Sequence, residues 1–192
     1  MKTKNIMIVG VGGQGTLLAS KLLGRLLLGK GYDVKVSEVH GMSQRGGSVV
    51  TYVRYGDKVY SPVIDKAEAD VIVSFEMLEA ARWVEYLAPG GTIITNTQQV
   101  NPMPVITGAC EYPENLEDKI KGLDINLDAL DALSLAETAG SAKAVNIVLM
   151  GRLSKLFDFT VEEWMDALEK SVPEKFLELN KKAFNLGREY GV

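Results

Sequence analysis

The chain has 192 residues, of which 46% are hydrophobic and 24% charged, a composition that supports a packed core and excludes extended disorder. Its 21 Lys and Arg residues against 25 Asp and Glu give a net charge of −4, whereas general nucleic-acid-binding proteins are basic. One cysteine, Cys110, and one histidine exclude an internal disulfide and a cysteine-held zinc or iron–sulfur centre.

The first residues do not resemble a membrane-directed segment. Only about five apolar positions precede the first glycine, whereas a signal peptide needs roughly 7–15 apolar residues and a membrane span roughly 20. We therefore expect a cytoplasmic protein with neither a membrane nor a nucleic acid as partner.

The first forty residues predict a strand, a glycine loop, a helix and a second strand. Residues 5–9 form a short apolar run with β-branched side chains, which is typical of a strand buried on both faces. Residues 16–28 carry a broad leucine-rich surface that ends at Gly29, as expected of a helix. Residues 32–39 alternate between polar and apolar side chains. We expect the two strands to be parallel neighbours joined by a right-handed crossover.

The middle of the chain contains further strand and helix patterns. Gly56-Asp57 separates two β-rich runs, residues 49–55 and 58–64, and this arrangement predicts a hairpin. The elements expected after it are a strand at 69–75, a helix at 76–87 ended by Pro89-Gly90-Gly91, a strand at 92–96, a polar loop, a helix at 112–121 and a short strand at 124–127.

The remainder is predicted to be helical. Ser141 is placed to cap a helix that reaches about residue 156, and Thr160 and Glu163 have the spacing of a capping box. Pro173 suits the first turn of a last helix ending at Glu189. No repeat or linker interrupts the pattern. Residues 1–192 are therefore predicted to form one α/β domain, three-layer and Rossmann-like, with a mainly parallel sheet, a β-hairpin insertion and a helical C-terminal part.

The first loop matches Gly-x-Gly-x-x-Gly between a strand and a helix. Glycine at these positions allows a phosphate to approach the free amides at the start of a helix. Glu38 stands where a dinucleotide-binding fold places an acid for the ribose. The alternative is a tight turn that only packs the helix on the sheet. The candidate ligand-binding residues of this loop are Gly10, Gly12, Gly13, Gln14, Gly15 and Thr16.

A second glycine-containing loop follows the second strand. At the carboxyl edge of a parallel sheet it would lie beside the first loop, where the ligands of such sheets bind. Its amides and the Arg45 guanidinium suit a phosphate or a carboxylate. Alternatively, Arg45 neutralises neighbouring acids and His40 is a structural histidine. The candidate residues of this loop are His40, Gly41, Gln44, Arg45, Gly46, Gly47 and Ser48.

The other notable polar residues are interpreted as structural. Glu76 and Glu79 fall in the first turn of a helix, where the helix dipole favours acids. Asn146 lies in an apolar helical stretch and is expected to bond the backbone, and Arg54 is expected in solvent or at an interface. Cys110 has no basic neighbour in the sequence and receives no nucleophilic role.

The motifs of independent catalysis are absent. Gln14-Gly15-Thr16 stands where a Walker loop has its lysine, and no Gly-x-Ser-x-Gly elbow occurs. The residues therefore favour recognition of an anion or nucleotide, with no residue assigned to bond-making and His40 as the one weak catalytic candidate.

Three segments carry a family resemblance: the glycine loop at 10–15, the block at 37–49 with its His-Gly-x-x-Gln-Arg-Gly-Gly-Ser sequence, and Ser-Pro-Val-Ile at 61–64. Together with the helical end, from Asn146 to Gly151 and from Asn180 to Gly187, they resemble the gamma-type domain of 2-oxoacid:ferredoxin oxidoreductases. Within that family the chain is most similar to the small, beta subunit of the indolepyruvate type. The resemblance covers nearly the whole chain.

The resemblance implies a role inside a larger enzyme that decarboxylates a 2-oxoacid oxidatively, forms the acyl-CoA and reduces ferredoxin. Thiamine diphosphate and iron–sulfur clusters would belong to a larger alpha subunit, with CoA as co-substrate and no cofactor held by this chain alone. The two glycine loops would serve ligand approach or the subunit interface. The choice of 2-oxoacid would be made by contacts on the partner.

Two other hypotheses remain open from the residues. One is a stand-alone NAD(P)-dependent oxidoreductase, for which Glu38→Ala should impair binding of NAD(H). The other is a non-enzymatic protein that binds a nucleotide or CoA. A homodimer is a further option, since apolar surface on the helical end suits either a partner or a second copy.

Overall fold

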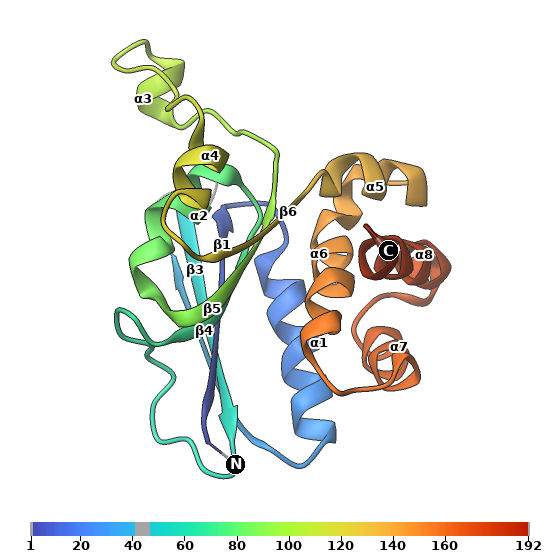
Figure 1. Cartoon of the computed structure of the whole chain (residues 1–192). Helices are drawn as coiled ribbons and strands as arrows, with labels where there is room; N and C mark the ends of the chain where they lie inside the picture. The colour runs from blue at the N-terminus through green and yellow to red at the C-terminus, as the bar shows by residue number, and fades with distance from the viewer. Residues whose placement is uncertain (1, 41–46, 192) are drawn as a thin grey trace.

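Six strands form one mixed sheet in the order β2-β3-β1-β4-β5-β6 in the computed structural model, which describes residues 2–40 and 47–191 (Figure 1). The pairs β1–β4, β4–β5 and β5–β6 are parallel, and β3 runs antiparallel to both β1 and β2. The strands are β1 (Lys4–Val11), β2 (Asp33–His40), β3 (Ser48–Gly56), β4 (Ala69–Ser74), β5 (Leu87–Asn96) and β6 (Asn126–Leu130).

Helices cover both faces of this sheet. α1 and α6 pack on one face, and α5, α7 and α8 lie beyond them, whereas α2 and α4 cover the other face (Figure 1). The short helix α3 projects from the body of the molecule. The helices are α1 (Thr16–Gly29), α2 (Met77–Trp83), α3 (Met103–Ile106), α4 (Leu116–Lys121), α5 (Ala132–Ala139), α6 (Val145–Leu153), α7 (Val161–Glu169) and α8 (Leu177–Glu189), with short 3-10 turns at Val84–Tyr86, Ala142–Ala144, Ser154–Leu156 and Glu174–Phe176.

The central strand β1 separates two hydrophobic cores. Ile6 and Ile8 point into the core shared with α1 and the C-terminal helices, and Met7 and Val9 point into the core under α2. Successive side chains of a strand alternate between faces, so a strand covered on both sides needs a continuous apolar run. This burial confirms the interpretation of residues 5–9.

The helices α6 and α8 cross at very short range. A Cβ atom on Gly151 would lie 2.0 Å from the carbonyl oxygen of Phe184, and one on Gly187 would lie 1.9 Å from that of Val148. Only glycine permits this approach. The crossing holds α8 against α6, which itself packs on the sheet.

The three-layer α/β class, the mainly parallel sheet and the helical end are confirmed. The prediction that the first two strands are hydrogen-bonded neighbours was wrong, because β3 is inserted between β1 and β2. The predicted hairpin also has a different partner. β3 pairs with β2 along its whole length, and residues 58–64 form no strand.

Several boundaries differ from the predicted ones. α2 ends at Trp83 and β5 begins at Leu87, so Pro89-Gly90-Gly91 lies inside the strand that was predicted to start after it. α4 begins at Leu116, later than predicted, because Pro113 precedes it and Asn115 adopts φ 54° at its N-cap. The Ser141 cap and the Thr160–Glu163 capping box are both present as predicted.

The carboxyl ends of β1, β4, β5 and β6 share one edge of the sheet. β2 runs in the same direction, and β3 begins at that edge. The glycine loop after β1 and the described end of the second loop, Gly47 and Ser48, therefore lie at the same edge of the sheet. Within the described residues, no helix is long and apolar enough to cross a membrane.

Candidate functional site

The glycine loop is braced by the side chain of Gln14. Its Oε1 accepts a hydrogen bond from the Val11 amide at 2.7 Å, and its Nε2 donates to the carbonyl oxygen of Phe75 at 3.3 Å. A Cβ atom on Gly10 would lie 2.8 Å from that Oε1 and 3.0 Å from the Cβ of Phe75. Gln14 thus holds the loop against the end of β4, and Gly10 leaves room for it.

Gly15 forms the N-cap of α1 with φ 89°, a left-handed conformation that favours glycine. The buried Asn146 of α6 donates from Nδ2 to the Gly15 carbonyl oxygen at 3.3 Å, and its Oδ1 accepts the Ile147 amide at 2.9 Å. A Cβ atom on Gly15 would lie 2.6 Å from that Nδ2. The prediction that Asn146 bonds the backbone is confirmed.

At the start of α1 the loop carries backbone donors that bond to no acceptor in the described part of the chain. Among the described residues, the backbone N–H groups of Gly13, Gly15 and Thr16 donate to no protein acceptor. Helix N-termini leave such amides unsatisfied, and together with the helix dipole they favour an anion. The first loop therefore has the donor pattern of a phosphate or carboxylate site.

The two loops are joined by a backbone hydrogen bond. The Gly12 amide donates to the Gly47 carbonyl oxygen at 2.9 Å, and Gly10 and Val11 pair with Val49 and Ser48 in the sheet. This contact confirms that the second loop ends beside the first. Four of the predicted binding residues lie outside the described part of the chain, namely Gly41, Gln44, Arg45 and Gly46. The side chain of His40 lies outside it as well.

Two clefts flank the glycine loop. The first, about 420 Å³, is lined by Gly12, Gly13, Gly15, Thr16, Leu17, Glu38 and Val49. The second, about 600 Å³, shares Gly13 and Gly15 and is also lined by Gln14, Gln98, Val100, Ala142, Lys143 and Val145. Glu38 thus borders one side of the loop and Lys143 the other.

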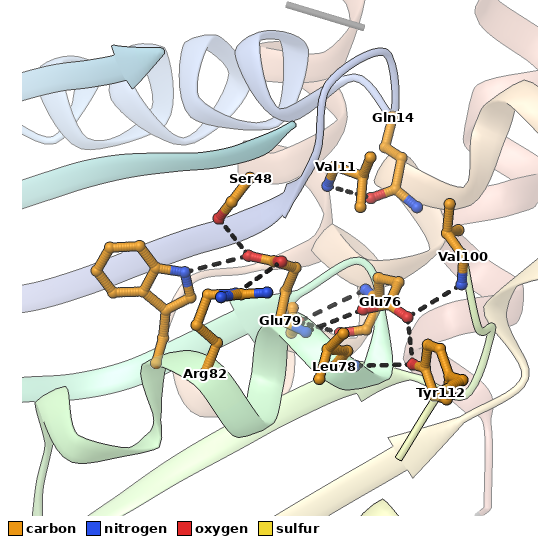
Figure 2. A network of polar contacts seen from close by, with 11 residues as sticks. Val11, Gln14, Ser48, Glu76, Leu78, Glu79, Arg82, Val100 and Tyr112 are labelled. Carbon is orange, nitrogen blue, oxygen red and sulfur yellow. Dashed lines mark hydrogen bonds and ion pairs between the residues drawn. The ribbon is translucent and has the colours of Figure 1, made fainter. Parts of the chain in front are cut away.

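A third cleft, about 370 Å³, lies on the α2 side of the same edge. Its floor contains two buried glutamates, Glu76 with 1% and Glu79 with 4% of its surface exposed. Glu76 is the N-cap of α2 and accepts the Glu79 amide at 2.9 Å through Oε2. Its Oε1 accepts the Tyr112 hydroxyl at 2.5 Å and the Val100 amide at 3.0 Å (Figure 2).

Glu79 connects α2 to the start of β3. The Ser48 hydroxyl and the Trp83 indole N–H, the latter at 3.2 Å, donate to its Oε2, and Arg82 Nε donates to Oε1 at 3.1 Å (Figure 2). Charge-assisted bonds of this kind are stronger than neutral ones. Glu79 therefore anchors Ser48, which is the last candidate residue of the second glycine loop and the first residue of β3.

Tyr112 stays protonated over a wide pH range. Burial and the hydrogen bond to the Glu76 carboxylate raise the pKa of its phenol above the ordinary value. The same hydroxyl accepts the Leu78 amide at 3.1 Å. Tyr112 thus acts as a neutral donor that bridges Glu76 and the first turn of α2.

The structural role predicted for Glu76 and Glu79 is confirmed, yet sequence analysis missed the burial of both carboxylates beside a cleft. It also missed Lys143, which no local motif marks. Arg54 differs from its prediction: it donates to Asn5 Oδ1 at 2.9 Å and to the carbonyl oxygens of Ser61 and Val63, so it braces the loop after β3. Cys110 is exposed.

The described residues offer no metal centre of their own: no three His, Cys, Asp or Glu side chains among them are grouped to hold an ion. With a single cysteine in the chain, an iron–sulfur cluster lacks its usual ligands here. The donors present, which are helix-start amides and cations, fit the phosphates or carboxylate of a bound molecule instead.

Comparison with known proteins follows this geometry. The family model described as pyruvate ferredoxin/flavodoxin oxidoreductase matches residues 5–190. The chain belongs to this family. It is 44% identical to the indolepyruvate oxidoreductase subunit IorB of Pyrococcus horikoshii, over 97% of this chain and 95% of that protein. The curated relatives that it matches are subunits of oxidoreductases, and this chain is accordingly a component of a 2-oxoacid oxidoreductase.

Solved structures share the fold. The pyruvate oxidoreductase subunit PORC of Thermotoga maritima superposes with a TM-score of 0.75 at 23% identity, covering 98% of this chain and 97% of that one. The 2-oxoglutarate:ferredoxin oxidoreductase of Magnetococcus marinus gives a TM-score of 0.75 at 20% identity, with 98% of this chain covering 31% of that chain. The same fold therefore occurs as a separate chain and as part of a longer one.

Proposed function

We propose that the chain is the small, non-autonomous subunit of an indolepyruvate-type 2-oxoacid:ferredoxin oxidoreductase. The observation that carries this proposal is the family match over residues 5–190, with four relatives named indolepyruvate oxidoreductase subunit IorB at 30% to 44% identity. These relatives are matched over 92% to 95% of their length.

Thiamine diphosphate and the iron–sulfur clusters belong, in this proposal, to a larger partner subunit that also contacts ferredoxin. The single cysteine of this chain supports that division of labour, because cluster ligation uses several thiolates. The whole complex works in the cytoplasm. This chain contributes binding surface and no bond-making group.

The ligand proposed for the two loops is CoA, held by its phosphates. The amides of Gly13, Gly15 and Thr16 and the ammonium of Lys143 provide donors and positive charge along two adjoining clefts. Arg45, on the second loop, would add a fork that binds a phosphate through two hydrogen bonds. Gln14 lines one of these clefts, and its side-chain amide also braces the loop.

Strand order disfavours the NAD(P) alternative. A dinucleotide-binding fold places its second strand beside the first, so that the acid at its end reaches the ribose. Here β3 separates β1 from β2, and Glu38 lies one strand further from the loop, roughly 5 Å per strand. Glu38 still lines the cleft at the loop, where it is proposed to contact a hydroxyl or amine of the ligand.

The decisive experiment is co-expression of this chain with the larger subunit from the same organism. We expect the two to co-purify, and the complex to oxidise indolepyruvate in the presence of CoA and an electron acceptor. The chain alone should turn over no 2-oxoacid. Turnover by the isolated chain, or tight binding of NAD(H) without a partner, would contradict the proposal.

A further inference from the structure

Residues 97–110 form an uncharged arm at the carboxyl edge of the sheet. None of these fourteen residues is charged, although 24% of the chain is. At the tip, Met103 and Ile106 of α3 expose 62% and 65% of their surface. Two large apolar side chains are thus held in solvent, on the part of the molecule that projects furthest in Figure 1.

The arm has a defined internal structure. The amides of Val105 and Ile106 both donate to the Pro102 carbonyl oxygen, at 2.9 and 3.1 Å, and those of Ala109 and Cys110 both donate to that of Pro104. The Thr107 hydroxyl donates to Met103 and Pro104 carbonyl oxygens. The tip therefore presents Met103 and Ile106 from an ordered helical turn.

Both ends of the arm are fixed to one buried group. Glu76 Oε1 accepts the Val100 amide on the incoming side and the Tyr112 hydroxyl just beyond the outgoing side. The Met77 amide also donates to the Gln98 carbonyl oxygen at 3.2 Å. A carboxylate that is 1% exposed is costly to bury unless it is fully bonded, so its position at the base of the arm is a built feature.

The arm also forms a wall of the third cleft. Val100, Pro102, Met103 and Pro104 line it opposite Ser48, Glu79 and Arg82. A protein that covers Met103 therefore also closes the cleft beside the end of the second glycine loop. The base of the arm also borders the glycine loop, because Gln98 and Val100 line the cleft of about 600 Å³ there.

We propose that the uncharged arm is the docking element for the larger subunit, which receives Met103 and Ile106 in an apolar socket free of charged groups. This inference rests on the proposed function. An arm without charge over fourteen residues suits burial against an uncharged surface of the partner. Exposed apolar groups of this kind mark interaction sites. Glu76 is the positioning residue that orients the arm.

The larger subunit is the proposed occupant, because the curated relatives of this chain are named as subunits of oxidoreductases. In the Magnetococcus marinus protein the same fold is about a third of one longer chain, so there it is covalently linked to further structure.

The test uses charged substitutions at the tip in the co-expressed complex. Met103→Asp and Ile106→Asp should each weaken binding of the larger subunit by at least tenfold, since burying a charge in an apolar socket costs more than losing the apolar contact. Tyr60→Asp is the matched control, because Tyr60 is 88% exposed and its loop follows β3 at the opposite edge of the sheet. Circular dichroism and thermal melting of each isolated variant should match those of the wild type.

The outcomes separate the two proposals. If the wild-type chain does not bind the larger subunit, the proposed function fails. If it binds and both tip variants bind as tightly, the arm is not the docking element. Loss of self-association in the tip variants, with the larger subunit still bound, would assign the arm to a second copy and overturn the inference.

Cys110 provides an independent measurement without mutation. It is the only cysteine of the chain, it is exposed, and it belongs to the arm. A thiol-reactive maleimide should modify Cys110 of the isolated chain rapidly and at least tenfold more slowly in the complex, measured by the intact mass of the small chain. Equal rates in the two states would contradict docking through the arm.

Discussion

Asn146 donates from its side chain to the Gly15 carbonyl oxygen at 3.3 Å and so connects α6 to the first turn of α1. The same asparagine is 4% exposed and lies close enough to Gly15 to exclude any side chain there. The C-terminal helices therefore help to set the position of the glycine loop. An anion site on this loop depends on a contact between residues 131 positions apart in the sequence.

Asn146→Ala should loosen the glycine loop and lower the free energy of unfolding by about 1 kcal/mol, because it removes the side-chain hydrogen bond to the Gly15 carbonyl oxygen. Urea unfolding measures the stability, and hydrogen exchange of the Gln14 and Leu18 amides, which donate to the Val11 and Gly15 carbonyl oxygens, measures the loop. The control is Asn185→Ala, an exposed asparagine of α8, which should change stability by only a few tenths of a kcal/mol. Equal effects of the two substitutions would show that the contact with Gly15 does not matter.

The fold class could be predicted because hydrophobic periodicity reports which faces of an element are buried. The continuous apolar run of β1 was sufficient to predict a strand buried on both faces, and the capping box was sufficient to predict the start of α7. The position of β3 could not be predicted this way. Alternation in β2 and β3 fixes which face is buried, yet it does not say whether a strand pairs with its sequence neighbour or inserts beside β1.

The candidate site was predictable only in its local parts. The second glycine loop was expected to lie beside the first, and its end does so at the bond between Gly12 and Gly47. The environment of Glu76 depends on Val100 and Tyr112, which are 24 and 36 residues away, and no spacing rule relates them. A first-turn acid looks the same in the sequence whether it faces solvent or anchors a buried network.

Two Gly→Ala changes, one at the crossing of α6 and α8 and one in α1, should have opposite effects on stability. Gly151→Ala should lower the free energy of unfolding by about 1–3 kcal/mol. The new Cβ would lie 2.0 Å from the Phe184 carbonyl oxygen and would push the helices apart. Gly24→Ala in α1 should stabilise it by up to about 1 kcal/mol, since its Cβ would meet only Val36 at 3.9 Å and alanine is the better helix former. Chemical denaturation of both variants checks the sign. Stabilisation by Gly151→Ala would show that the helices separate without cost.

Arg45 tests the proposed anion site in solution. In the purified complex, Arg45→Ala should weaken CoA binding by about 10- to 100-fold, the effect of losing a charged hydrogen bond worth about 1.5–3 kcal/mol. Arg45→Lys should recover only part of the loss if a planar fork holds the phosphate. Calorimetry with CoA and with dephospho-CoA, compared with Tyr60→Ala as a remote control, gives the measurement. An unchanged affinity in Arg45→Ala would remove this residue from the site.

Tyr112 predicts how stability responds to alkaline pH. Burial and the Glu76 carboxylate raise the pKa of its phenol in the folded protein, so its contribution to stability is complete below the unfolded value of about 10 and is lost as the pH rises toward the folded pKa. Tyr112→Phe should therefore show a shallower fall in the free energy of unfolding above pH 10 than the wild type.

At neutral pH the same variant should cost about 1 kcal/mol, because the Leu78 amide loses its acceptor and Glu76 loses a donor. Urea unfolding at pH 7 and above pH 10 measures both effects, and Tyr60→Phe serves as the control because Tyr60 is 88% exposed. The Val100 amide, which shares Glu76 Oε1 with Tyr112, should also exchange faster in Tyr112→Phe. A wild-type alkaline slope in Tyr112→Phe would show that this phenol does not titrate with unfolding.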